Sequence, residues 1–329
     1  MTRRELIALL ASAAAAEWPG AVWGQQERVR RIGVLSAFSE EDPETKVRLS
    51  NFLTRLQSLH WRVGDNLLIE YRYAVGDGDR IVSSAREMVA LAPEAIMTMS
   101  NPVLAALIRE TRAIPIVFAQ VADPVGSGFV SSLARPGGNV TGFANLEPPI
   151  GGKWVELLKE AAPPTTRMLA LHHPQIAANV SFLRAAEAAG RNLGVTIVSA
   201  GVTNPAEIER SVNAFTTEPN GGVIAMPNPV VNGARSLIIE FALKHRMPTL
   251  GAFRYMAASG TLLSYGNEGN DLFTHTADYI DRILRGAHPG DLPVQAPTKF
   301  ELTINLKAAR TLGLTIPPTL LARADEVIE

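Results

Sequence analysis

Short aliphatic runs alternate with longer segments of helical spacing through the first half of the chain, and this alternation constrains the fold most. "RIGVLSAF" (31–38) is a buried-strand candidate, and apolar residues at helical spacing follow it over 43–59. Further strands are expected at 66–74, 95–100, 114–121 and 138–143, with helices over 79–91, 102–111 and 127–134. Parallel strands need helical crossovers, so this order predicts an α/β fold with a doubly wound parallel sheet.

The same pattern restarts after an expected helix over 152–161. Strands are expected at 167–173, 195–200, 221–227 and 247–253, and helices over 176–192, 205–217 and 231–245. A chain of 329 residues with 47% hydrophobic residues can fill two domains of ordinary size. We therefore expect two doubly wound lobes.

The C-terminal part departs from this sequential order. A strand over 260–266, a helix over 271–286 and an extended segment over 292–306 suit a chain that recrosses between lobes. Crossings near 143–146, 264–267 and 293–297 would form a three-crossing hinge. Lobe one is then expected to comprise 28–144 plus 267–293, and lobe two 145–266 plus 294–329.

The segment 123–143 is rich in glycine and proline, which disfavour the interior of helices and strands. We interpret it as a cleft loop, a short helix, an "RPGG" turn and the strand that leads into the first crossing. A bulky β-branched residue at Gly142 or Gly266 is expected to impair hinge closure more than the stability of either lobe.

The N-terminus is typical of an export signal spanning residues 1–24. Two arginines precede an apolar run over 6–16, and Val22 and Gly24 occupy the −3 and −1 positions of a cleavage site before Gln25. "TRRELI" also resembles the twin-arginine motif. A frayed amphipathic helix is the alternative, disfavoured because no polar residue occurs over 13–16. The sequence therefore predicts a periplasmic protein.

Composition excludes several classes of partner and chemistry. A net charge of −1 offers no basic surplus for nucleic acid, and the absence of cysteine removes disulfides and thiolate ligands. The six histidines are scattered, and no HExxH, GxSxG, P-loop or complete GxGxxG motif occurs. No cofactor, metal ion or catalytic group is expected, and the pattern favours a binding protein over an enzyme.

Candidate binding residues follow from the rule that ligands of open α/β sheets lie beyond the carboxyl ends of the strands. Lobe one contributes Ser36, Ala37, Phe38, Ser100, Asn101, Gln120 and Asp123. Lobe two contributes His172, His173, Asn228, Phe253 and Tyr255.

Several of these candidates have a purely structural alternative. Ser100 or Asn101 could cap the helix that Pro102 opens, with or without receiving a ligand carboxylate. Asp123, which precedes a proline, could form an Asx turn instead of accepting from a solute.

The histidine and aromatic candidates have alternatives of the same kind. One histidine of the 172–173 pair is expected to face the cleft while the other turns away; the alternative is a packed or surface histidine without ligand contact. The aromatic residues Phe38, Phe253 and Tyr255 could stack on a flat ligand or serve only as core or lid packing.

The chain resembles the exported ABC transporter substrate-binding proteins of the tryptophan/tyrosine-type family. The resemblance lies in "IEYRYAVGDGDR", "IPIVFAQVADPVGSGFVSSLARPGGNVTGF", "KWVELLKEAAP", "LLSYG" and "LPVQAPTKFELTINLKAARTLGLTIPPTLLARADEVIE". It implies a type I periplasmic-binding-protein fold. It also implies that a monomer captures a small solute and delivers it to a cognate ABC permease in the inner membrane.

The resemblance also suggests how a solute is held. Members that bind aromatic amino acids use a Ser/Thr-Pro helix start for the carboxylate and an acidic residue of lobe two for the amine. Ser100, Asn101 and Pro102 match the first feature, whereas Asn228 stands where the acid is expected and "HHPQ" where an Asn-Pro turn is common. An amide cannot supply the charge that pairs with an ammonium group, so a carboxylate-bearing aromatic or other organic acid is the expected cargo.

Two rival functions share this pattern. A ligand sensor for a membrane receptor would bind solute in the same way without transport. A doubly wound hydrolase or transferase would share the strand order but show turnover and coupled titrating groups.

Overall fold

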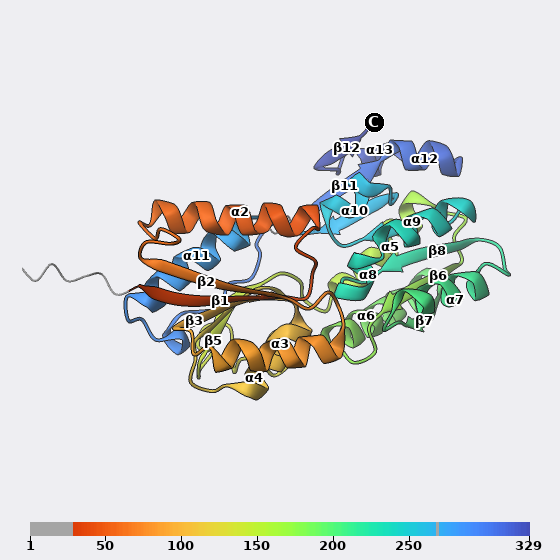
Figure 1. Ribbon diagram of the computed structural model, residues 1–329. Coiled ribbons are helices and arrows are strands. Elements are labelled where there is room, and N and C mark those ends of the chain that lie inside the picture. Colours follow the sequence, from red (N-terminus) through yellow and green to blue (C-terminus); the bar gives the residue numbers. More distant parts are fainter. Residues whose placement is uncertain (1–28, 268–269) are drawn as a thin grey trace, which may run out of the picture.

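The computed structural model describes residues 29–267 and 270–329, which form two α/β lobes side by side (Figure 1). The expected export signal over 1–24 lies outside the described residues. Within them, no helix is both long and apolar enough to cross a membrane.

Lobe one is built on a five-stranded parallel sheet with the order β2-β1-β3-β4-β5. Its strands are β1 (Arg30–Ser36), β2 (Leu67–Tyr73), β3 (Ala95–Met99), β4 (Ile116–Val121) and β5 (Val140–Ala144). Its helices are α2 (Pro43–Ser58), α3 (Gly78–Ala90), α4 (Asn101–Glu110) and α11 (Asn270–Leu284). Because neighbouring side chains of a strand point to opposite faces, Val34 packs in the core under α2 and α11, and Leu35 in the core under α3 and α4.

Lobe two contains a seven-stranded sheet with the order β12-β11-β10-β9-β8-β6-β7, in which only β10 and β11 run antiparallel. Its strands are β6 (Arg167–His172), β7 (Thr196–Gly201), β8 (Gly221–Ala225), β9 (Thr249–Gly251), β10 (Leu263–Gly266), β11 (Glu301–Asn305) and β12 (Glu326–Ile328). The part from β7 to β10 repeats the strand order of lobe one.

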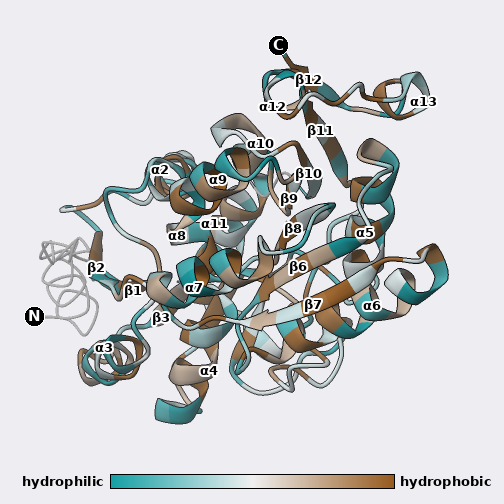
Figure 2. Cartoon of the chain, turned by 90° about the vertical axis from the view of Figure 1, so that its right-hand side faces the viewer, coloured by the Kyte–Doolittle hydropathy of each residue, from teal (hydrophilic) through white to brown (hydrophobic). Residues whose placement is uncertain are grey.

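The helices of lobe two cover both faces of this sheet. They are α5 (Ile150–Ala161), α6 (Ala177–Leu193), α7 (Pro205–Phe215), α8 (Pro229–Gly233), α9 (Arg235–Lys244), α10 (Arg254–Ser259), α12 (Leu306–Leu312) and α13 (Pro318–Leu321). Helices of both lobes carry hydrophobic and hydrophilic residues together, as expected when one side packs on a sheet and the other meets water (Figure 2).

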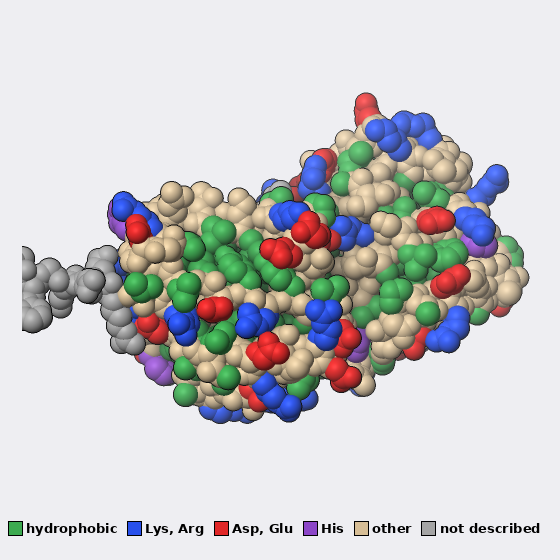
Figure 3. Space-filling view, in the orientation of Figure 1, with side chains coloured by type: hydrophobic (Ala, Val, Ile, Leu, Met, Phe, Trp, Pro, Cys, Tyr) green, Lys and Arg blue, Asp and Glu red, His purple; other side chains and the backbone are tan. Residues whose placement is uncertain are grey.

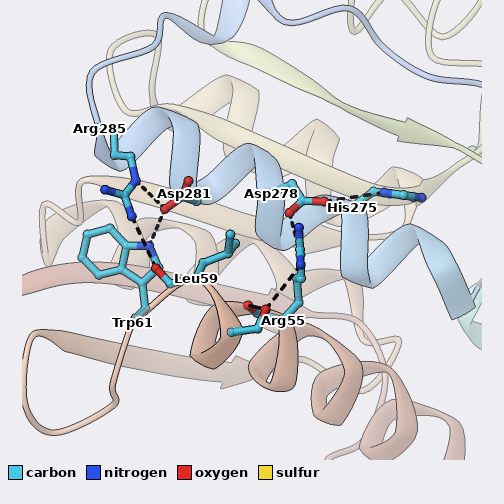
Figure 4. Close-up of polar contacts among 8 residues, drawn as sticks. Arg55, Leu59, Trp61, His275, Asp278, Asp281 and Arg285 are labelled. Carbon is cyan, nitrogen blue, oxygen red and sulfur yellow. Dashed lines mark hydrogen bonds and ion pairs between the residues drawn. The ribbon is translucent and has the colours of Figure 1, made fainter.

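Helix α11 follows strand β10 of lobe two but packs on lobe one (Figure 4). Arg55 Nε of α2 lies 2.7 Å from Asp278 Oδ1, and Asp281 Oδ1 accepts from Trp61 Nε1 at 2.8 Å and from Arg285 Nε at 2.7 Å. The chain then returns to lobe two as β11.

The segments that join the lobes lie against one another. Ala144 N donates to Gln295 O at 2.8 Å, and Gln295 N donates to Gly142 O at 3.0 Å. Asn145, after the first crossing, and Asn267, after β10, are both buried. The architecture confirms the expected class of two doubly wound α/β lobes.

One of the expected helices is wrong, and another is divided in two. The segment 127–134 forms turns, in which Phe129 N bonds to Pro124 O and Ser131 N to Pro136 O, because a glycine at φ +73° and flanking prolines prevent a helical register. The helix expected over 231–245 is divided into α8 and α9 at Ala234, which leaves the helical region at φ −93° and ψ 16°.

Candidate functional site

A small cavity of about 30 Å³ lies between the lobes, beyond the carboxyl ends of β3, β4 and β8. It is lined by Phe38, Ser100, Asn101, Pro102, Gln120, Ala122 and Asn145 from lobe one and the first crossing, and by Ile176, Pro227, Asn228, Pro229, Asn232 and Phe253 from lobe two. We call this space the inner cavity.

An outer cavity of about 490 Å³ adjoins it and shares Asn101, Pro102, Ile176 and Pro229. Like the inner cavity, it takes its lining from both lobes. A larger groove of about 900 Å³ between α2 and edge strand β2 is lined by lobe one alone. Only the first two spaces can change when the lobes move, so the interlobe cavities are the candidate site.

The lining of the inner cavity contains no charged side chain among the described residues. Its polarity comes from amides, one hydroxyl and several helix starts, of which that of α8 is capped by Asn228. Helices α4 and α6 begin at the cavity, and neither has a side-chain cap. Free backbone N–H groups and the partial positive charge of a helix N-terminus therefore face the space from both lobes.

Ser100 immediately precedes α4 and is only 7% exposed, yet its Oγ has no hydrogen-bond partner in the described chain. Its backbone lies at φ 81° and ψ 148°, a strained conformation for a residue with a side chain. Buried hydroxyls are nearly always bonded, so this geometry leaves a donor available to a molecule in the cavity.

Asn101 has a different role, because both polar atoms of its side chain are bonded within lobe one. Nδ2 donates to Ala122 O at 2.7 Å, and Oδ1 accepts from Ala122 N at 3.0 Å. The amide ties α4 to the end of β4 and caps no helix. Of the two capping candidates, neither side chain caps α4, and only Ser100 keeps its polar atom free.

Three further buried amides line the inner cavity without a side-chain hydrogen bond to the described residues. They are Gln120 on β4, Asn145 on the first crossing and Asn232 on α8. An amide both donates and accepts, so this set can bond to several kinds of neutral or anionic group. Asn145 and Asn232 were not among the sequence candidates; Asn145 carries a signal, since it follows a predicted strand at a predicted crossing.

Removal of the Ser100 hydroxyl is the direct test of its role. Ser100→Ala is expected to weaken solute binding by about 1 to 2 kcal/mol, because a charge-assisted hydrogen bond is lost. The melting temperature of the solute-free protein should stay unchanged, since Oγ bonds to nothing in the described chain. Calorimetric titration of both proteins measures the difference, and equal affinities would remove Ser100 from the site.

Asn228 lines the cavity but acts as a structural cap. Its Nδ2 donates to Asn179 Oδ1 at 3.0 Å and to Met226 O at 3.1 Å, while its Oδ1 accepts from Val231 N at 3.0 Å. The amide thus joins the starts of α6 and α8. Both N–H groups of Nδ2 are used, and its neutral oxygen carries no charge to pair with an ammonium group.

Asn228→Asp is therefore expected to destabilise lobe two rather than create an amine site. The carboxylate would face the two acceptors that the amide now satisfies, at a cost of about 2 to 3 kcal/mol. Thermal unfolding measures the loss, with Asn213→Asp on the exposed side of α7 as the control. Wild-type stability combined with new amino-acid binding would contradict this role.

Several sequence candidates lie outside both cavities. Ser36 Oγ accepts from Phe38 N at 3.0 Å and shapes the turn after β1, and Ala37 packs in the core of lobe one. Asp123 Oδ1 accepts from Gly126 N at 2.9 Å, the turn-forming role weighed as its alternative. None of these three presents a side chain to the cleft.

The histidine pair divides between two environments. His173 lines the outer cavity, whereas buried His172 turns away from it and places Nε2 2.9 Å from Ser199 Oγ. Burial lowers the pKa of both imidazoles, so both are neutral at pH 7. No group of three or more potential metal ligands occurs in the described residues.

Aromatic rings border the inner cavity from opposite lobes. Phe38 follows β1, and Phe253 follows β9 and stacks on Tyr255 with 5.6 Å between ring centres. Tyr255 itself lines neither cavity, and burial raises its pKa to about 12. The inner cavity, at about 30 Å³, has room for only one or two water molecules, so a flat ring could contact both phenylalanines only if the cleft widened.

Comparison with known proteins agrees with this architecture. The family described as "ABC transporter substrate binding protein" matches residues 31–328. A curated relative, the tyrosine-binding protein of Clostridioides difficile (strain R20291), is 23% identical over 278 residues, which is 83% of this chain and 79% of the relative.

Two solved structures resemble the whole of the two-lobed body. A conserved domain protein from Vibrio cholerae superimposes with a TM-score of 0.84 at 31% identity over 91% of this chain and 100% of the other. An ABC domain in complex with L-Trp from Streptococcus pneumonia gives 0.82 at 26% identity over 91% and 99%. Because the family match spans nearly the entire described structure, this chain belongs to the ABC transporter substrate-binding protein family.

Proposed function

We propose that the protein captures a small organic acid with a flat, apolar body and delivers it to a cognate ABC permease. The observation that carries the proposal is the interlobe site. The inner cavity, about 30 Å³, uncharged and polar, would take the carboxylate, and the flat body would extend into the adjoining outer cavity of about 490 Å³, which is also lined by both lobes. In this proposal the solute carboxylate lies at the start of α4 and accepts from Ser100 Oγ and from free backbone N–H groups.

The absence of an acidic lining residue supports an acid rather than an amino acid as cargo. Neither cavity has an aspartate or glutamate in its described lining, and Asn228 is committed to capping. The relatives named above bind tyrosine and L-Trp. We infer that this chain shares with them a site for a carboxylate and a flat ring but lacks the partner for the amine.

Transport would depend on closure of the two lobes about the crossings. Solute contacts come from both lobes, so they are complete only in the closed form, and binding shifts the population toward it. The permease would then recognise the closed form. This role requires binding and release without chemical change of the solute, and we propose a binding protein rather than an enzyme.

The proposal also includes a periplasmic location and a monomeric state, as expected from the sequence. The mature protein would begin at Gln25, reside in the periplasm and act as a monomer. Sequencing the N-terminus of periplasmic protein tests the cleavage site.

The decisive experiment is native mass spectrometry of protein purified from its own periplasm, followed by identification of the released molecule. A carboxylic acid without an amine would support the proposal, and a co-purified amino acid would contradict the solute class. Uptake of the identified solute, measured with and without the permease, distinguishes a transporter from a sensor for a membrane receptor.

A further inference from the structure

We infer that Arg48 is a positioning residue that joins the aromatic walls of the cleft across the two lobes and, with the ion pair Asp42–Arg235, holds the closed form together. The inference rests on the proposed function only in that both involve lobe closure. Arg48, Asp42 and Arg235 themselves line neither interlobe cavity.

Arg48 projects from α2 of lobe one and is 4% exposed. Its guanidinium carbon lies 5.8 Å from the ring centre of Phe38 and 5.6 Å from that of Tyr255. Phe38 is the lobe-one wall of the inner cavity, and Tyr255 stacks on Phe253, the lobe-two wall. The Arg48 side chain thus contacts Phe38 directly and Phe253 through Tyr255.

The contact between the Arg48 guanidinium and the Tyr255 ring is electrostatically favourable. A guanidinium stays charged when buried, and its nearest described carboxylate, on Glu44, is 4.0 Å away. Its Nε has no hydrogen-bond partner in the described residues. The ring faces of Phe38, Tyr255 and Phe273 therefore supply much of its stabilisation, and opening of the lobes would withdraw the one ring that belongs to lobe two.

A second contact crosses the same boundary nearby. Arg235 Nη1, at the start of α9, lies 2.7 Å from Asp42 Oδ2, with the two side chains 19% and 18% exposed. The Arg235 guanidinium is also 5.7 Å from the Tyr255 ring centre. Tyr255 of lobe two thus lies close to one arginine of each lobe.

The two carboxylate oxygens of Asp42 interact with different lobes. Oδ1 caps α2 by accepting from Glu44 N and Thr45 N, and Oδ2 meets Arg235. Acidic and basic side chains meet at this junction, beside the N-terminal end of α2 (Figure 3). Because Asp42 has both roles, Arg235 is the partner to alter if the cap is to be kept.

The test measures the distance between the lobes without any solute. The chain has no cysteine, so Ser83→Cys on α3 and Ala206→Cys on α7 create unique, exposed sites for spin labels on opposite lobes. Double electron–electron resonance of the labelled protein gives the closed and open populations. The ligand-free wild type should show a closed population.

Arg48→Gln is expected to lower the ratio of closed to open molecules about fivefold to tenfold, because the contact between Arg48 and Tyr255 is lost. Arg235→Gln should lower it in the same direction while leaving the α2 cap intact. Arg48→Lys keeps the charge over the rings and should recover part of the closed population.

Arg55→Gln is the matched control on the same helix. Arg55 pairs with Asp278 entirely within lobe one, so its loss should lower the melting temperature without changing the distance distribution. Unchanged distances in both Arg48→Gln and Arg235→Gln, or a wild type that is wholly open, would overturn the inference. Since no solute or permease enters the measurement, its outcome is separate from that of the proposed cargo.

Discussion

Gly142→Val is expected to prevent folding of lobe one, with a loss of roughly 4 kcal/mol or more in the free energy of unfolding. A Cβ at Gly142 would lie 2.1 Å from the carbonyl oxygen of Phe118 and 2.6 Å from its nitrogen. Both atoms belong to the backbone of the neighbouring strand β4, which cannot move aside without breaking the sheet. The backbone of Gly142 also has φ +150°, which side chains disfavour.

These distances contradict the expectation that a β-branched residue at Gly142 or Gly266 would act mainly on closure of the lobes. At Gly266 a Cβ would lie 2.0 Å from the carbonyl oxygen of Ala252, again on a neighbouring backbone. Both glycines lie near the crossings, but close strand contact, rather than hinge torsion, is what requires them.

Intrinsic fluorescence can follow each lobe separately during denaturation by urea. The described residues contain Trp61 in lobe one and Trp154 in lobe two. In the Gly142→Val variant the Trp61 transition should be absent or shifted to much lower urea, while the Trp154 transition persists. Gly233→Ala, where a Cβ meets nothing within 4 Å, should unfold like the wild type. A variant of Gly142 with wild-type stability but reduced closure would restore the hinge interpretation.

Most of the fold could be predicted because most of its strands, unlike the partly exposed edge strands β2 and β7, are buried on both faces. Such strands appear as short aliphatic runs, and all five strands of lobe one coincide with runs expected from the sequence. Glycine and proline residues explain why the helix expected over 127–134 does not form. The apolar residues over 127–134 suggested a helix, but neighbouring glycines and prolines decide the backbone there.

The site was less predictable, because strand order places residues at an edge without showing whether their atoms are free. Ser100 and Asn101 are adjacent in sequence, yet the Ser100 hydroxyl has no partner in the described chain, whereas both polar atoms of the Asn101 side chain are bonded. Arg48 did carry a signal: its spacing puts a charged residue on the buried face of α2 with Thr45 and Phe52. What the charge contacts, Tyr255 of the other lobe, depends on tertiary structure.

The second large effect concerns the α-ammonium group of a solute. We expect 3-(indol-3-yl)propanoate to bind about 100-fold tighter than L-tryptophan, and 3-(4-hydroxyphenyl)propanoate about 100-fold tighter than L-tyrosine, a difference of roughly 3 kcal/mol. Each pair differs only in the ammonium group. In the closed cleft that group would lose water, find no carboxylate in the described lining, and face the positive ends of α4 and α6.

Calorimetric titration of both pairs tests this discrimination, and tighter binding of the amino acids would refute it. Ser100→Ala separates recognition of the carboxylate from discrimination against the α-ammonium group. If Ser100 Oγ meets the carboxylate that all four compounds share, the variant should weaken every complex by a similar factor and leave the acid-to-amino-acid ratio unchanged. A change in that ratio would instead place Ser100 beside the α-carbon substituent, and the start of α4 would then determine which class of solute is accepted.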